Sequence, residues 1–168
     1  MSLAVEHRLH ICKYRRGVDD DKIKILENNL RDIDLLEMME MSKYDDDGEK
    51  ANRIDIDPDY EHYFLLNDED YPIGIFGISK AKMMFGKCIY CLMSKELDRE
   101  IGYKKSFVEL SKEVIPTWID EGVPLFNFIH KDNKKSKLWL KSFGAVFRND
   151  INLGDMILFQ IKPQRKGE

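Results

Sequence analysis

Residues 87–104 read KCIYCLMSKELDREIGYK. The first part, Lys87–Ser94, is apolar on both faces of an extended chain, which predicts a central strand that is covered on both sides. A linker, Lys95–Gly102, follows it and leads into a long helix, Tyr103–Glu121. A helix that starts soon after a central strand offers free N–H groups and the positive end of its dipole to an anion. The sequence therefore predicts an anion site at this junction, beside Arg99.

In the part of the chain that follows this long helix, strands and helices alternate. The expected elements are a strand at Leu125–Ile129, an amphipathic helix at Asn133–Phe143 that Gly144 ends, and a closing hairpin of Ala145–Arg148 with Met156–Ile161. A strand, a helix and a second strand in this order indicate a βαβ unit with two parallel strands. Pro116 lies inside the long helix and is expected to kink or shorten it.

On the N-terminal side, two helices separate a first strand from a hairpin. The expected elements are a strand at Arg8–Lys13, a helix that opens at Asp19–Asp21, a second helix from about Asp32, a turn at Asp45–Glu49, and strands at Tyr60–Leu66 and Tyr71–Ser79. The fold class is therefore a mixed α/β (α+β) domain, with a largely antiparallel sheet and the βαβ unit in its C-terminal half. The methionines of the second helix, Met38, Met39 and Met41, are expected as core filler.

Charge is distributed unevenly along the 168 residues. The first 84 residues carry a net charge of −8 and the last 84 a net charge of +4, which give the overall −4. Five lysines lie in the segment Lys131–Lys141, so a small anionic ligand would be favoured in the second half, although a solvated helix face is the simpler explanation of these lysines. An overall negative charge argues against nucleic-acid binding through charge alone.

Length and composition indicate one domain, which we expect to span residues 4–162, with a disordered tail at 163–168. The longest uncharged stretch, Tyr71–Ser79, is too short to cross a membrane. Three cysteines and a charged N-terminal segment without an apolar core predict a cytoplasmic protein that is not secreted.

Common catalytic and metal-binding motifs do not fit the sequence. Cys88 and Cys91 form a C-x-x-C pair, but on a strand their thiols point to opposite faces, so no metal or redox site is expected there. Asp55, Asp57 and Asp59 lack the glycine of a calcium-binding loop and are interpreted as an ordinary loop.

Two segments together resemble the GNAT (N-acetyltransferase) superfamily. Arg99 and Gly102 match its phosphate loop, Gln/Arg-x-x-Gly-x-Gly/Ala, whereas Lys104 stands at the final small position. Asn133 is similar to the asparagine that opens the family's later helix, and Ser136, Lys141, Gly144 and Phe147 follow it, similar to a helix that ends in Lys-x-Gly-Phe. The order of elements is also similar to a whole GNAT domain.

The resemblance implies acetyl-CoA or another acyl-CoA as cofactor and an amine on a protein or small molecule as acceptor. The implied cofactor-binding residues are Leu92, Met93 and Ser94 for backbone pairing with the pantetheine, Arg99, Gly102 and Lys104 for the pyrophosphate, and Asn133 near the acyl end. Arg31, Asp34 and Glu37 are candidates for the acceptor side, or for plain surface charges.

The catalytic residues are not identified by this resemblance. In the family, one position of this helix commonly carries a tyrosine that protonates the leaving thiolate, and the corresponding residue here is Leu140. The central strand has no carboxylate that could act as a base, and the nearest one is Glu96. The sequence is therefore compatible with an N-acyltransferase whose active site is degenerate.

A narrower resemblance extends over most of the chain. The pattern from Asn29 through Arg31 and Asp34 to Glu37 is similar to the first helix of GNAT-like proteins from tailed bacteriophages, and residues 139–147 resemble the ending of internal virion protein A of short-tailed phages. This resemblance implies the host cytoplasm or the virion interior. Three functions stay open: an acyl-CoA-dependent N-acyltransferase, a non-enzymatic virion or host-interacting protein that keeps the fold, and a nucleic-acid modifier.

Overall fold

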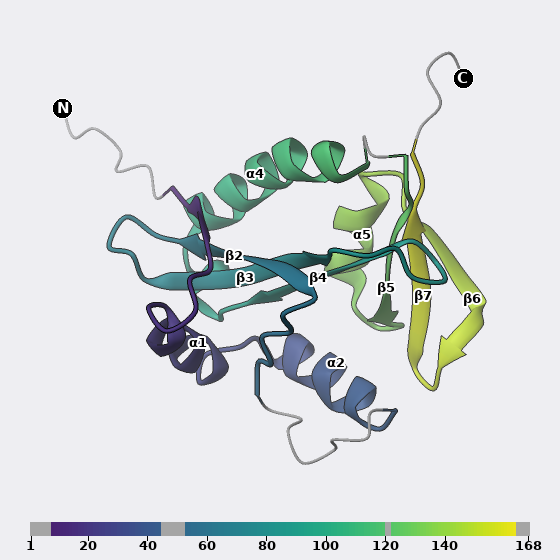
Figure 1. Ribbon diagram of the computed structural model, residues 1–168, viewed down its shortest axis with the longest axis horizontal. Coiled ribbons are helices and arrows are strands. Elements are labelled where there is room, and N and C mark those ends of the chain that lie inside the picture. The colour runs from purple at the N-terminus through teal and green to yellow at the C-terminus, as the bar shows by residue number, and fades with distance from the viewer. Residues whose placement is uncertain (1–7, 45–52, 120–121, 164–168) are drawn as a thin grey trace.

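The computed structural model describes residues 8–44, 53–119 and 122–163. Within these residues seven strands form one sheet in the order β1-β2-β3-β4-β5-β7-β6 (Figure 1). The strands are β1 (His10–Lys13), β2 (Tyr60–Leu66), β3 (Pro72–Ser79), β4 (Lys87–Met93), β5 (Leu125–His130), β6 (Val146–Leu153) and β7 (Met156–Ile161). The helices are α1 (Asp20–Glu27), α2 (Asp32–Ser42), α3 (Glu96–Arg99), α4 (Ile101–Ile119) and α5 (Lys134–Lys141).

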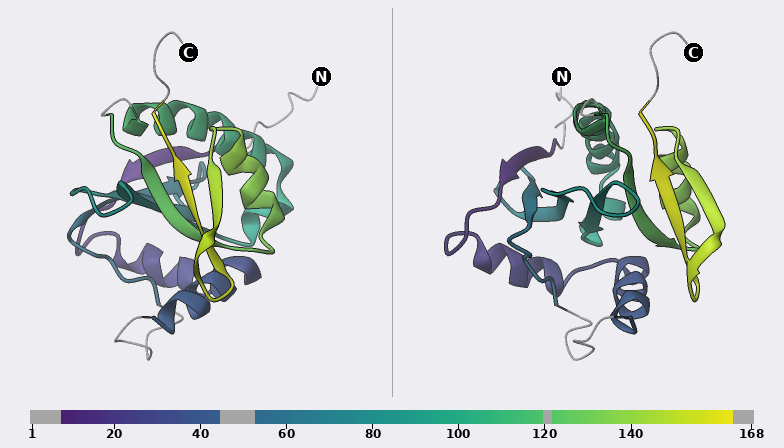
Figure 2. Two further views of the ribbon diagram at one scale, coloured as in Figure 1. Left: turned by 90° about the vertical axis from the view of Figure 1, so that its right-hand side faces the viewer. Right: turned by 45° about the vertical axis from the view of Figure 1, so that its right-hand side comes forward.

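The helices cover both faces of the sheet. Helices α1 and α2 lie on one face, and α4 and α5 lie on the other, as the views in Figures 1 and 2 show. Strand β3 is buried at all of its residues because it lies inside the sheet between these two layers. The core accordingly divides into an α1/α2 side around Phe64 and Ile75 and an α4/α5 side around Phe76 and Leu125.

The sheet divides where β4 meets β5. All neighbouring strands are antiparallel except these two, which run parallel and pair only at Lys87 with Leu125 and at Cys88 with Phe126. Gly86 allows the close approach at this point, since a Cβ atom there would overlap the carbonyl oxygen of Pro124. Beyond Cys88 the two strands separate, and their carboxyl ends are no longer hydrogen-bonded to each other.

The predicted fold class is confirmed, and the predicted strands Tyr60–Leu66 and Met156–Ile161 have the same bounds in the structure. The expected linker Lys95–Gly102 is partly wrong, because a short helix, α3, forms in it and α4 already begins at Ile101. Helix α4 continues past Pro116 to Ile119, so the proline does not stop it. Strand β6 extends to Leu153, beyond the expected Arg148.

Some expectations lie outside the described residues, namely the turn at Asp45–Glu49 and the tail beyond residue 163. Among the methionines expected in the core, Met38 packs partly buried against the α1/α2 side, whereas Met39 is 52% exposed. No helix in the part of the chain that the structure describes is long and apolar enough to cross a membrane.

Candidate functional site

Strand β4 has a free backbone edge where it leaves β5. The N–H group of Ser94 donates to the carbonyl oxygen of Ile73 at 2.8 Å, which fixes the alternation of β4 against β3. Since successive residues of a strand direct their backbone groups to opposite neighbours, Cys91 directs its N–H and C=O groups away from β3, into the gap. No described residue hydrogen-bonds to these groups of Cys91, so this edge is open to a ligand.

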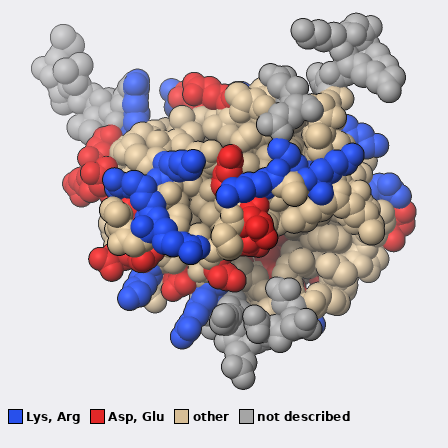
Figure 3. Space-filling view, viewed as in Figure 1, with Lys and Arg blue, Asp and Glu red and all other residues tan. Residues whose placement is uncertain are grey.

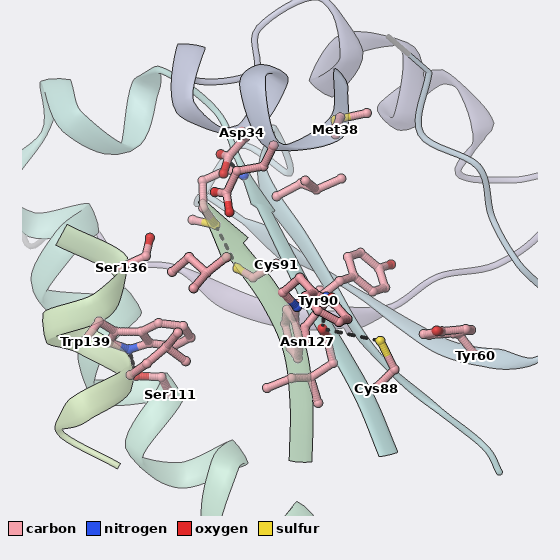
Figure 4. Close-up of a pocket in the computed structure, with 18 of the residues that line it drawn as sticks. Asp34, Met38, Tyr60, Cys88, Tyr90, Cys91, Ser111, Asn127, Ser136 and Trp139 are labelled. Carbon is pink, nitrogen blue, oxygen red and sulfur yellow. Dashed lines mark hydrogen bonds between the residues drawn. The ribbon is translucent and has the colours of Figure 1, made fainter. Parts of the chain in front are cut away.

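A cavity of about 530 Å³ occupies the gap between β4 and β5. It reaches both faces of the sheet, with α2 on one side and α4 and α5 on the other (Figure 4). Figure 4 shows Cys91, Tyr90 and Asn127 at its centre, Asp34 and Met38 on the α2 side, and Trp139 with Ser111 on the α4/α5 side. The cavity has the size of a ligand pocket, 300–1,000 Å³ as a rough class.

Helix α2 closes one end of this cavity by binding the end of β4. The N–H group of Met93 donates to the Asp34 carboxylate at 3.0 Å, and the carbonyl of Met93 accepts from the N–H group of Arg31 at 3.0 Å. The guanidinium of Arg31 donates to both carboxylate oxygens of Asp34, at 2.9 and 3.2 Å. Asp34 is buried, and this pairing compensates its charge.

Glu37 extends the same contact to the end of β5. Its carboxylate accepts from the N–H group of His130 at 3.1 Å and from the Asn133 amide at 2.6 Å. Asp34 and Glu37 are three residues apart, so they lie on one face of α2 and bind the two separated strands together. We call Arg31, Asp34 and Glu37 the α2 clamp.

The Glu37 carboxyl has an unusual proton affinity. Burial raises its pKa to about 7, and the negative charge of Asp34 acts in the same direction. The hydrogen bonds from His130 and Asn133 and the charge of Arg31 oppose this increase. A carboxyl group with a pKa near neutrality that lines a cavity can accept a proton from a bound molecule.

The sequence predicted that Leu92, Met93 and Ser94 pair with a ligand through their backbone. In the structure Leu92 and Ser94 direct their backbone groups to β3, and α2 already binds both groups of Met93. The open backbone edge therefore belongs to Cys91. Sequence reasoning missed this residue because composition does not reveal which alternate residues of a strand face a given neighbour.

The predicted phosphate residues lie together around α3. Gly102 is in the first turn of α4. Arg99 pairs with Glu96 at 2.7 Å and Lys104 pairs with Asp98 at 3.2 Å, with each basic side chain at least 48% exposed. These basic groups therefore have acidic partners that an anion would have to displace.

A second hollow of about 630 Å³ lies beside Arg99, between α3 and the start of α5. Its basic residues are Arg31, Lys95, Arg99, Lys134 and Lys135, and its acidic residues are Asp32, Asp98 and Asp132. Arg31 and Asn133 line this hollow and the cavity, so the two adjoin. Figure 3 shows basic and acidic side chains intermingled over one face of the molecule, without one large basic patch.

Asn133 begins α5 and connects it to the α2 clamp. Its side-chain oxygen accepts from the N–H group of Ser136, which caps the helix, while its amide donates to Glu37. Leu140 is buried on the same helix and lines the cavity, so the position where the family commonly has a tyrosine holds no proton donor.

Two tyrosines line the cavity on its α2 side instead. The Tyr90 hydroxyl lies 2.5 Å from Nδ1 of His62, and Tyr60 lies beside Cys88 (Figure 4). Burial raises the pKa of both phenols, so they stay protonated at neutral pH. Burial also raises the pKa of the Cys91 thiol to about 12, which leaves it protonated and weakly nucleophilic.

Cys88 and Cys91 lie on opposite faces of β4, as the strand alternation predicted: Cys88 is beside Tyr60, and Cys91 Sγ is 3.5 Å from Met93 Sδ on the α4 side (Figure 4). In the described part of the chain, no three His, Cys, Asp or Glu side chains come close enough to hold a metal ion.

Comparison with known proteins identifies the fold. No protein-family model matches the sequence, and neither does any curated protein. The GNAT domain of S. lividans PAT superposes with a TM-score of 0.63 at 9% identity, over 94% of each chain. The ribosomal-protein-S18-alanine N-acetyltransferase of Escherichia coli superposes with a TM-score of 0.57 at 10% identity, over 95% of this chain and 97% of that one.

A third solved structure, spermidine N-acetyltransferase from Vibrio cholerae in complex with CoA and spermine, has a TM-score of 0.56 at 14% identity, over 93% of this chain and 96% of that one. Each superposition spans nearly the whole of both chains. This protein therefore has the GNAT fold, the fold of these N-acetyltransferases.

Proposed function

We propose that this protein is an acyl-CoA-dependent N-acyltransferase. The observation that carries the proposal is the open backbone edge of Cys91 in a cavity between two separated strands, with the titratable Glu37 carboxyl at the same cavity. The shared fold supports it, because one structure with this fold was solved with CoA and spermine.

The residues present fit an acyl-CoA. The pantetheine carries amide groups, which the N–H and C=O groups of Cys91 would bind as a neighbouring strand does. The diphosphate would lie in the hollow beside α3, where Arg99 and Lys95 supply positive charge. Gly102 does not line this hollow, but it follows Arg99 by three residues in the first turn of α4, whose N–H groups favour an anion. When bound, acyl-CoA supplies the acyl group as a thioester.

Glu37 has the properties of the general base in this proposal. A nucleophilic amine must be unprotonated, and a carboxylate with a pKa of about 7 accepts a proton at neutral pH better than an ordinary one. His130 and Asn133 keep the carboxylate oriented. Leu140 donates no proton to the departing thiolate, so this step depends on solvent or on a tyrosine hydroxyl across the cavity.

The phage type and the host-cytoplasm or virion location remain proposals, based on the first-helix pattern. The structure gives that pattern a physical role, because Arg31, Asp34 and Glu37 form the α2 clamp. A non-enzymatic role as a virion or host-interacting protein is the second candidate. It is favoured by the acidic partners of Arg99 and Lys104, which compete with a diphosphate.

Titration calorimetry with acetyl-CoA and with desulfo-CoA tests the proposal. Desulfo-CoA has no sulfur atom, so it serves as the control for reactions of the ligand with the three cysteine thiols of the protein. We expect micromolar binding that Arg99→Glu weakens by about ten-fold or more, because a charge-assisted contact to phosphate becomes a repulsion. The matched control is Arg148→Glu on β6, which also breaks an exposed Arg–carboxylate pair but lies away from the hollow.

An affinity that Arg99→Glu leaves unchanged would refute the diphosphate site. Absence of binding at millimolar acetyl-CoA would refute the enzymatic proposal and favour the second candidate, which pull-down from virions and host extracts would then examine.

A further inference from the structure

Helix α4 directs a stripe of large apolar side chains at the sheet without burying them fully. Phe107, Leu110, Val114 and Trp118 recur every three or four residues and pack against the core on that side. Each is only partly buried, although each faces inward, because they line the cavity. These side chains thus form an apolar wall over the gap between β4 and β5.

Helix α5 supplies a second wall at an angle to the first. The Trp139 ring lies 5.1 Å from the Phe107 ring, centroid to centroid, and its Nε1–H group donates to the Ser111 hydroxyl at 3.0 Å. Figure 4 shows this hydrogen bond, which orients the indole. Leu140 lines the cavity from the same helix. We call Phe107, Leu110, Val114, Trp118, Trp139 and Leu140 the apolar arm of the cavity.

The charged groups gather at a different part of the cavity. Asp34 and Glu37 belong to α2 and Arg31 is its N-cap, on the opposite face of the sheet. The other charged lining residues, Arg53, Asp55 and Asp57, belong to the segment before β2, where Ile54 and Ile56 pack on the α1/α2 side of the core. The polar lining closest to the apolar arm includes Ser111, whose hydroxyl is already engaged by Trp139, and Ser136. The cavity is therefore amphipathic, with a polar end at α2 and an apolar end under α4 and α5.

The volume of the cavity indicates the size of the acyl group that it can hold. Protein interiors contain few voids larger than a water molecule, and a water occupies about 30 Å³ in the liquid. A methylene group is of similar size, so an eight-carbon chain needs on the order of 240 Å³. The whole cavity, about 530 Å³ over both of its ends, has room for such a chain together with the end of a pantetheine, whereas an acetyl group would fill far less of it.

We infer that the acyl group this protein binds is a medium-length aliphatic chain, which lies in the apolar arm. The inference rests on the proposed function and narrows its substrate class. Cys91 connects the proposed pantetheine site with the apolar arm. Its backbone N–H and C=O groups face the gap, and its side chain packs on the α4 side with the residues of the apolar arm. A thioester paired with this edge would direct its chain toward Val114 and Trp118.

Titration calorimetry with CoA, acetyl-CoA, octanoyl-CoA and octanoate tests the inference. Each buried methylene strengthens binding by about four-fold at most. Six additional methylenes should therefore make octanoyl-CoA bind about ten-fold or more tightly than acetyl-CoA, even when much of this gain is lost to ordering of the chain.

Two substitutions fill the apolar arm, Val114→Phe and Leu110→Phe, and either one suffices if the other fails to fold. We expect each to reduce the ratio of octanoyl-CoA to acetyl-CoA affinity to about one. The matched control is Val108→Phe on the same helix, since Val108 is 38% exposed and does not line the cavity. This control should preserve the chain-length preference.

The possible outcomes separate the two proposals. Equal affinity for acetyl-CoA and octanoyl-CoA would overturn the chain-length inference and leave the N-acyltransferase proposal intact. Binding of neither ester would overturn the proposed function and this inference with it, whether or not octanoate binds. A preference for octanoyl-CoA that Val114→Phe and Leu110→Phe do not reduce would overturn the assignment to the apolar arm.

Discussion

At Glu37, burial and hydrogen bonding act on one carboxyl group in opposite directions. Burial favours the protonated form, whereas the contacts from His130 and Asn133 favour the ionised form. Burial prevails, and the pKa is about 7. The residue therefore contributes to the stability of the fold in a way that depends on pH.

The free energy of unfolding should reveal this dependence. Glu37 has a folded pKa of about 7 and an ordinary value of 4.5, so the folded protein holds one more proton between these values and unfolding releases it. Stability from this group is thus fully present below about pH 4.5 and is lost as the pH rises to about 7, by about 3 kcal/mol at most. Denaturant titrations of wild type and Glu37→Gln should show that the variant lacks this slope, and parallel pH profiles would contradict the assignment.

The buried pair of Arg31 and Asp34 gives a second prediction at the scale of the residue. Asp34→Ala leaves the partly buried guanidinium of Arg31 without its carboxylate and the N–H group of Met93 without an acceptor. We expect a loss of about 3–5 kcal/mol in the free energy of unfolding. Asp150→Ala, which breaks an exposed pair with Arg148, should have a much smaller effect on the free energy of unfolding, because solvent screens that pair. Equal losses for the two variants would show that the α2 clamp is not a stabilising contact.

At the scale of the elements, the turn before β4 determines how closely β4 and β5 approach each other at the closed end of the gap. Gly86 has a φ of +123°, and a Cβ atom there would overlap the carbonyl oxygen of Pro124, which accepts from the N–H group of Lys87. Both facts require glycine where β4 and β5 begin to pair.

Gly86→Ala should therefore destabilise the protein more than Gly17→Ala does. Gly17 also has a positive φ, of +79°, which is closer to the left-handed helical region, and nothing lies within 4 Å of its added Cβ atom. We expect a loss of about 1 kcal/mol for Gly17→Ala and 2 kcal/mol or more for Gly86→Ala in thermal or denaturant unfolding. Similar losses would mean that the approach of Pro124 is not tight.

The elements themselves could largely be predicted from the sequence, because apolar alternation and helical spacing are local. Tyr60–Leu66 alternates in this way, and its predicted bounds agree with the structure. Helix α3 was missed because its four residues include three charged ones and carry no apolar period. The open edge at Cys91 was also missed, since it depends on how β4 pairs with β3 and on where β5 departs.

The candidate site was predicted in part. Arg99, Gly102 and Lys104 do gather near α3 and the start of α4, while their acidic partners were not foreseen. Glu37 and Asn133 were both candidates, but their mutual hydrogen bond joins residues far apart in the chain. Such contacts follow from tertiary packing and leave no local signal in the sequence.

In the whole molecule, the sheet consists of two halves that share few backbone contacts. β1–β4 form one half and β5, β7 and β6 the other, and they pair directly only at two residues on each strand. The α2 clamp connects the halves at the other end of the gap. Loss of the clamp should therefore loosen one half relative to the other without unfolding either.

Hydrogen–deuterium exchange can measure this coupling. In Glu37→Ala we expect faster exchange of amides in β5, including His130, and unchanged exchange in β2 and β3. Glu40→Ala on the same helix is the control, because Glu40 pairs with exposed Lys43 and does not contact the sheet through that bond. Uniformly faster exchange in every strand would instead indicate global destabilisation.

The position of the two tryptophans has a practical consequence. Trp118 and Trp139 are the only tryptophans in the sequence, and both side chains line the cavity. An aliphatic ligand that displaces water from these indoles would lower the polarity around them and move their fluorescence emission to shorter wavelength. The unlabelled protein thus carries its own optical sensor for what enters the cavity, and a screen of acyl chains can begin with its intrinsic emission spectrum.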